Sequence, residues 1–255
     1  MFNLAEKFYE SMELYDDCKV DSTIFKKAFY DNADITKVDK DILKEDVEKI
    51  IFKYSLKEGN INVPTYKDEE IEYDEIEIIE VNISNESKHK KICELIQKVI
   101  PYPLILVVRM DNKILINTAY KRINKNDEEK NTIEQFIYTD WFDLDNINEN
   151  QMKFLQSINI KKLSFVNMYK LYCSFVDKIN ILNASKLSGD FNSLENKDIE
   201  VINKLNDEVN YIDDEINKLR ILIKKESQFN RKMDMNIKIK KLETKRKDLI
   251  VELKS

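Results

Sequence analysis

The last sixty residues carry the most regular hydrophobic pattern in the chain. Steps of three and four residues alternate between seven apolar positions: Ile202, Leu205, Val209, Ile212, Ile216, Leu219 and Ile223. After a polar break at residues 226–232, the same spacing returns at Met235, Ile239, Leu242, Arg246, Leu249 and Leu253. This is the heptad seam of a coiled coil. The two series predict an antiparallel helical hairpin over residues 197–255, with one unbroken helix as the alternative.

Residues 1–187 mix helical and strand patterns and predict an α+β globular domain. Helices are expected at residues 2–14, 39–57, 90–99 and 164–186, the second because its apolar positions follow the spacing of a helix face. Strands are expected at residues 61–63, 73–83, 104–110, 113–123 and 132–141. The order strand, helix and three strands favours a mixed β-sheet with one crossover helix and an antiparallel meander. Residues 188–196, which contain Gly189, mark the boundary before the hairpin.

The composition excludes several classes of site. The chain has two glycines, so a glycine-rich phosphate loop cannot be built. Three scattered cysteines and the single His89 do not have the spacing of a zinc site or of a nucleophile and its base. We therefore expect no catalytic residue, metal ligand or cofactor. Neither a signal peptide nor a membrane span is recognisable, which predicts a cytoplasmic protein.

Charge is distributed unevenly. Residues 217–255 contain thirteen Lys or Arg and five Asp or Glu, a net charge of +8, so residues 1–216 carry −14 of the total of −6. The basic residues in 218–254 could meet phosphate or an acidic protein surface, or could simply solvate the hairpin. The hairpin tip is the first candidate contact: Gln228, Phe229, Asn230, Arg231 and Lys232. An exposed aromatic beside cations suits a protein or phosphate contact, unless Phe229 folds back over the seam.

A second candidate contact lies in the predicted sheet. Lys121 and Arg122 follow Tyr120 on one strand and, with Trp141, could present a basic and aromatic surface. The alternative is that these residues only complete the strand.

Several segments resemble an uncharacterised bacterial family, the domain of unknown function 4391 family. They are VEKIIFKYSLKEGNINV at residues 47–63, IPYP at 100–103, AYKRIN at 119–124, TDW at 139–141, NASK at 183–186 and ESQFNRKMDMN at 226–236. The resemblance covers most of the chain in the same order. It implies a gene context with SNF2-type helicases and DNA methyltransferases in phage-defence clusters, and no established activity.

Three functions agree with these observations. The first is a non-enzymatic accessory subunit that docks on a helicase or another DNA-processing partner, in a bacterial anti-phage defence system; the hairpin could also self-associate. The second is a nucleic-acid-binding protein that uses the basic hairpin. The third is a degenerate or active nuclease with a restriction-endonuclease-like core, in which Glu80 would hold the metal. Asn82 then stands where such a nuclease carries lysine, which argues against activity.

Overall fold

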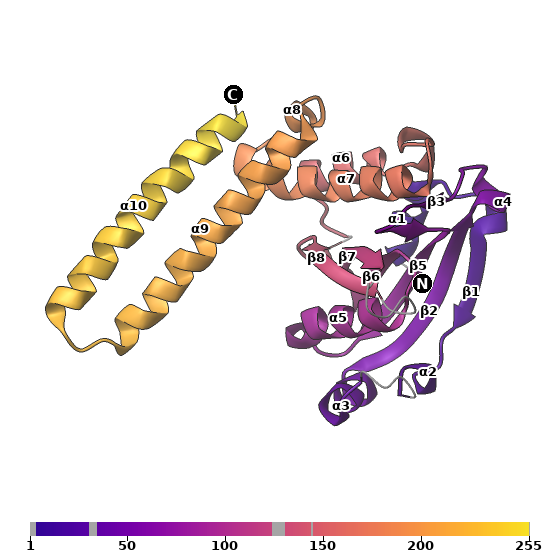
Figure 1. Cartoon of the computed structure of the whole chain (residues 1–255), viewed down its shortest axis with the longest axis horizontal. Helices are drawn as coiled ribbons and strands as arrows, with labels where there is room; N and C mark the ends of the chain where they lie inside the picture. Colours follow the sequence, from indigo (N-terminus) through magenta and orange to yellow (C-terminus); the bar gives the residue numbers. More distant parts are fainter. Residues whose placement is uncertain (1–3, 31–34, 124–130, 144, 255) are drawn as a thin grey trace. The chain divides into compact units, whose positions relative to one another are not determined.

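The computed structural model describes residues 4–30, 35–123, 131–143 and 145–254. The chain divides into two compact units, residues 1–179 and 180–255 (Figure 1). The first is a mixed α+β domain, and the second contains the helical hairpin. None of the helices in the described ranges is long and apolar enough to cross a membrane.

The first unit is built on a mixed sheet of seven strands. Six of them run in the order β1-β2-β5-β6-β7-β8, and β9 pairs with β7. Their bounds are β1 (Lys19–Thr23), β2 (Val47–Lys57), β5 (Glu75–Ile83), β6 (Leu104–Met110), β7 (Lys113–Ile123), β8 (Asn131–Tyr138) and β9 (Phe142–Asp143). A small separate sheet pairs β3 (Tyr66–Lys67) with β4 (Glu72–Tyr73).

The expected crossover and meander are both present. β5 and β6 are parallel and are joined through α5 (His89–Val99), whereas β6, β7 and β8 pair antiparallel in sequence order. Asp111 has a left-handed φ of 52° and begins the β6–β7 turn, a conformation that Asp tolerates better than most residues. Strand β5 is buried on both faces, as its almost unbroken apolar and acidic pattern indicated.

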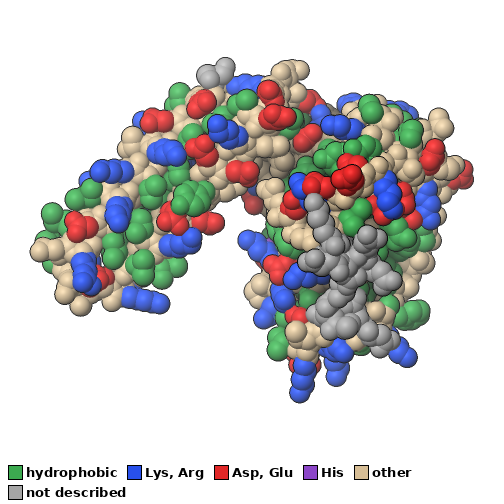
Figure 2. All heavy atoms as spheres, in the orientation of Figure 1, with side chains coloured by type: hydrophobic (Ala, Val, Ile, Leu, Met, Phe, Trp, Pro, Cys, Tyr) green, Lys and Arg blue, Asp and Glu red, His purple; other side chains and the backbone are tan. Residues whose placement is uncertain are grey.

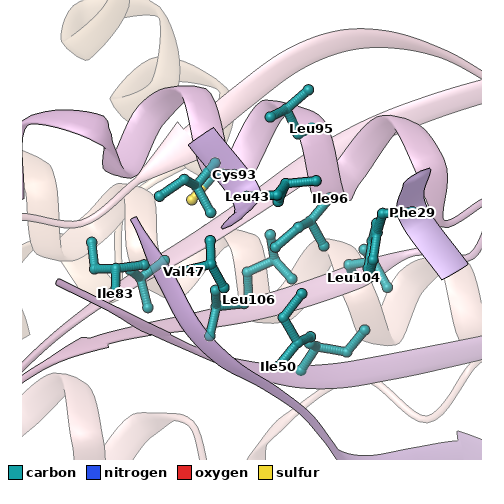
Figure 3. Packing of buried hydrophobic residues seen from close by; sticks show 14 of the residues in the cluster. Phe29, Leu43, Val47, Ile50, Ile83, Cys93, Leu95, Ile96, Leu104 and Leu106 are labelled. Atoms are coloured by element: carbon teal, nitrogen blue, oxygen red, sulfur yellow. The ribbon is translucent and has the colours of Figure 1, made fainter. Parts of the chain in front are cut away.

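Helices surround this sheet. They are α1 (Leu4–Met12), η1 (Asp16–Cys18), α2 (Lys27–Tyr30), α3 (Lys37–Glu45), α4 (Glu58–Ile61), η2 (Glu86–Lys88), α6 (Glu149–Ser157), η3 (Ile160–Lys162) and α7 (Met168–Ser188). One core lies between the sheet and helices α3 and α5, where Leu43 and Ile96 pack with Val47, Leu104 and Leu106 (Figure 3).

The helix expected at residues 39–57 is wrong in its second half. Helix α3 ends at Glu45, and residues 47–57 form β2, between β1 and β5. The ladder with β5 is irregular at two places, between Val47 and Lys49 and between Phe52 and Tyr54. Each irregularity shifts the alternation of faces. Buried positions therefore recur every three residues at Val47, Ile50, Lys53 and Leu56, with Ser55 also buried, and imitate the spacing of a helix.

Three smaller expectations also need correction. The strand expected at residues 61–63 is absent. The Asn60 side chain accepts a hydrogen bond from Lys57 N and donates one to the carbonyl of Ser55, and these two bonds close the helical turn α4. Helix α7 starts at Met168 rather than at residue 164, since Asn167 accepts the amide of Lys170 and caps the first turn. The strand expected at residues 132–141 ends at Tyr138 as β8, and the short β9 follows only at Phe142.

The hairpin of the second unit consists of α9 (Ile199–Lys225) and α10 (Phe229–Lys254), preceded by the short α8 (Phe191–Glu195). Its buried apolar positions are all predicted seam residues: Ile202, Leu205, Val209, Ile212, Ile216, Ile239, Leu249 and Leu253. Arg246 interrupts the apolar seam, and its guanidinium forms two bonds to Asp213 of α9, at 2.7 and 3.1 Å. The antiparallel hairpin is confirmed, and the single unbroken helix is excluded.

Candidate functional site

The hairpin turn is only three residues long, Glu226–Gln228. The Glu226 carboxylate accepts the amides of Ser227 and Gln228, at 2.8 and 2.9 Å, and these bonds hold the pKa of Glu226 below its usual range. The first helical bond of α10 runs from the Lys232 amide to the Gln228 carbonyl. Asn230 lies inside α10 and lacks a positive φ. The turn is therefore closed by a side chain, and the polar break is shorter than predicted.

Phe229 is the first residue of α10 and does not cover the seam. Its side chain is 75% exposed. Two further apolar side chains follow at steps of four residues, Met233 at 53% and Ile237 at 46% exposure. Residues four apart lie on one face of a helix, so these three form a continuous apolar stripe on α10. Figure 2 shows hydrophobic and basic side chains close together at this end of the hairpin.

Two cations lie in the first turn of α10, where the helix dipole favours acidic residues. Arg231 and Lys232 place positive charge beside the amide end of the helix, which costs about 0.3–1 kcal/mol for each exposed cation. Arg231 is 3.7 Å from the Glu226 carboxylate. Lys232 has no ion-pair partner within the described part of the chain. Since helix stability does not explain these cations, they are candidates for contact with another molecule.

Most of the basic residues near the tip are likewise uncompensated. Pairs within the hairpin engage Lys218, Arg220, Arg231, Lys245 and Arg246 with carboxylates. Besides Lys232, five lysines near the tip have no such partner in the ranges that the structure describes: Lys224, Lys225, Lys238, Lys240 and Lys241. The tip half of the hairpin is thus a basic surface that carries an apolar stripe.

Lys121 and Arg122 belong to the first unit, and the structure buries Lys121. The Lys121 side chain lies inside the first unit, and its ammonium donates to the carbonyls of Ile100 and Tyr102, both at 2.7 Å. Burial lowers the pKa of Lys121 to about 7. Its contact role is therefore corrected to a structural one, in which it clamps the α5–β6 turn. Arg122 is exposed and paired with Glu70 and Glu134.

Glu80, the acid of the nuclease hypothesis, is held by protein groups. It is 2% exposed; the Tyr9 hydroxyl donates to its Oε2 at 3.0 Å, and Arg109 lies 3.9 Å from its Oε1. Among the described residues, no three His, Cys, Asp or Glu side chains gather closely enough to hold a metal ion. Glu80 is therefore a buried carboxylate in contact with protein groups.

Comparison with known protein families finds a match to this sequence. A family model described as "Domain of unknown function (DUF4391)" matches residues 12–245, which include the sheet, α9, the tip and the first part of α10. The chain belongs to this family. No curated protein and no solved structure matches it. The expected membership in the DUF4391 family is thereby confirmed.

The sequence pattern located the tip but not two of the three residues of its apolar stripe, Met233 and Ile237. Neither residue belongs to the heptad seam. The signal was present, because Phe229, Met233 and Ile237 are three apolar residues at steps of four outside the seam positions. An apolar series with helical spacing outside the seam indicates a second apolar face.

Proposed function

We propose that this DUF4391 protein is a non-enzymatic accessory subunit that docks, through the tip of its hairpin, on a protein partner of a DNA-processing system. The observation that carries the proposal is the exposed apolar stripe at the start of α10, formed by Phe229, Met233 and Ile237 and bordered by uncompensated cations. Aromatic anchors and arginines are enriched among the residues that dominate protein–protein binding energy.

The structural cost of the tip supports this proposal. An exposed phenylalanine adds little to the stability of the hairpin. Arg231 and Lys232 lower the stability of α10, because their positive charges lie at the positive end of its dipole. Local rules of helix design are broken mainly where function requires it. A stiff hairpin also holds its tip side chains in a fixed geometry, which lowers the entropy lost on binding.

The identity of the partner rests on the resemblance described above. The family context suggests an SNF2-type helicase or a DNA methyltransferase in an anti-phage defence cluster. The environment of Glu80 supports a non-enzymatic role, because its carboxylate is occupied by Tyr9 and lies near Arg109.

Direct nucleic-acid binding is a second candidate, favoured by the lysines of the hairpin that lack carboxylate partners. Phosphate contacts depend on the number of cations more than on their exact place, and they weaken steeply with salt. A docked protein instead depends on a few residues at the tip.

The test compares two matched charge reversals in the full chain. The tip variant combines Arg231→Glu with Lys232→Glu, and the control combines Lys247→Glu with Lys254→Glu at the other end of α10. Tagged wild type and both variants are purified from the native host, and the co-purifying proteins are quantified by mass spectrometry. We expect the tip variant alone to lose a helicase-type or methyltransferase-type protein, with unchanged thermal stability.

Other outcomes would redirect the proposal. If both reversals weaken binding to single- or double-stranded DNA in proportion to the charge removed, with a steep dependence on salt, the nucleic-acid function replaces docking. If the tip variant retains every partner of the wild type, the tip is not the docking surface.

A further inference from the structure

A second series with heptad spacing runs along the outer side of α9. Its steps alternate between four and three residues, and all eight of its side chains are exposed: Glu200, Lys204, Asp207, Tyr211, Asp214, Lys218, Ile221 and Lys225. None of these residues belongs to the buried seam with α10. We call this series the outer stripe of α9. Alternating steps of three and four residues are the spacing by which a helix pairs with another helix.

The charges of the outer stripe are arranged from acidic to basic. Its three carboxylates lie at residues 200–214, together with Lys204, and the other two lysines lie nearer the end of the helix. The helix dipole explains Glu200 in the first turn and Lys225 in the last turn. It does not explain Asp207, Asp214 and Lys218, which lie in the middle of a helix of 27 residues.

The series is complementary to itself when reversed. Because its steps are palindromic, an antiparallel copy with its midpoint between residues 212 and 213 places each member opposite another member. Glu200 then faces Lys225, and Asp207 faces Lys218. Asp214 faces Tyr211, and Lys204 faces Ile221. Each pair occurs twice, as two-fold symmetry requires. A parallel copy would instead place like charges opposite each other.

The side chains are free to make these contacts. Neither Asp207 nor Asp214 has an ion-pair partner in the described part of the chain. Lys218 contacts Glu215 of its own helix at 2.9 Å, which leaves other hydrogens of its ammonium available. Tyr211 and Ile221 supply the exposed apolar area, at 66% and 54% exposure.

We propose that two copies of this protein associate antiparallel through the outer stripe of α9. The contact covers about 38 Å, since 25 residues separate its ends at about 1.5 Å per residue. Its pairs are mostly charged and exposed, so the association is reversible and weakens as salt rises. The contact is separate from the tip of α10, and it does not depend on the proposed docking function.

A charge exchange in the full chain tests this pairing by sedimentation equilibrium at low ionic strength. We expect the wild type to form a dimer whose dissociation constant rises with salt. Lys218→Glu changes two contacts at once and should weaken association by roughly tenfold or more. Adding Asp207→Lys to the same chain recreates both pairs with the opposite polarity and should restore association. Lys247→Glu on α10, an equal change of charge outside the stripe, should leave it unaltered.

The rescue separates a specific contact from a folding defect, because a misfolded Lys218→Glu chain would not regain association through a second reversal. The proposal is overturned if the wild type stays monomeric at every concentration, if Lys218→Glu associates as well as wild type, or if the double variant fails to recover.

Discussion

The substitution Phe229→Ala separates a contact residue from a cap of the hydrophobic seam. The side chain is 75% exposed, so folding removes only a quarter of its surface from water. With roughly 200 Å² for a phenylalanine, about 50 Å² is buried, which is worth about 1 kcal/mol at ~25 cal/mol per Å². Part of this burial already exists against the neighbouring turn of an isolated helix. We therefore expect Phe229→Ala to lower the free energy of unfolding by less than about 1 kcal/mol.

Ile212→Ala is the matched control, since Ile212 is buried in the seam of the same hairpin. Its truncation should cost about 2–5 kcal/mol. Both variants are measured by urea denaturation of the full chain, followed by far-ultraviolet circular dichroism. A loss of about 2–4 kcal/mol for Phe229→Ala would show that this ring caps the seam, and the contact interpretation of the tip would then be refuted.

Four further outcomes are expected. Residues 197–255 expressed alone should be helical by circular dichroism, and a disordered spectrum at high concentration would contradict an autonomous hairpin. Asp213→Ala should lower the free energy of unfolding by about 1–2 kcal/mol, because Arg246 loses its carboxylate, whereas Arg246→Leu should be neutral or stabilising. Burial raises the pKa of Asp177 to about 6, whereas the unfolded chain has the ordinary aspartate pKa near 4. The free energy of unfolding should therefore fall as the pH rises from about 4 to about 6, because the unfolded chain loses this proton more readily. Asp177→Asn should remove that slope in a pH series and stabilise the protein at pH 7 by about 1–3 kcal/mol. With Mg²⁺ or Mn²⁺, the pure protein should leave DNA intact on a gel; cleavage that disappears in Glu80→Ala would establish a nuclease.

Local patterns were enough to predict the parts of the chain whose contacts lie close in sequence. The β6–β7 hairpin was predicted with both bounds correct, because its two apolar strands flank the turn residues Asp111 and Asn112. The seams of α9 and α10 were predicted because each helix buries one stripe against a neighbour that repeats the same spacing. The tip was recognisable from local composition as well, since an aromatic residue and two cations stand together where the heptad spacing breaks.

The tertiary structure decided what depends on distant partners. Whether residues 47–57 form a helix or a strand was settled by pairing with β5, whose two irregularities give β2 a period of three. Lys121 is a surface residue by composition, yet the carbonyls of Ile100 and Tyr102 hold its ammonium inside the domain. Phe229 could have covered the seam or faced solvent. The Glu226 carboxylate closes the turn early, so α10 starts at Phe229 and leaves that ring exposed.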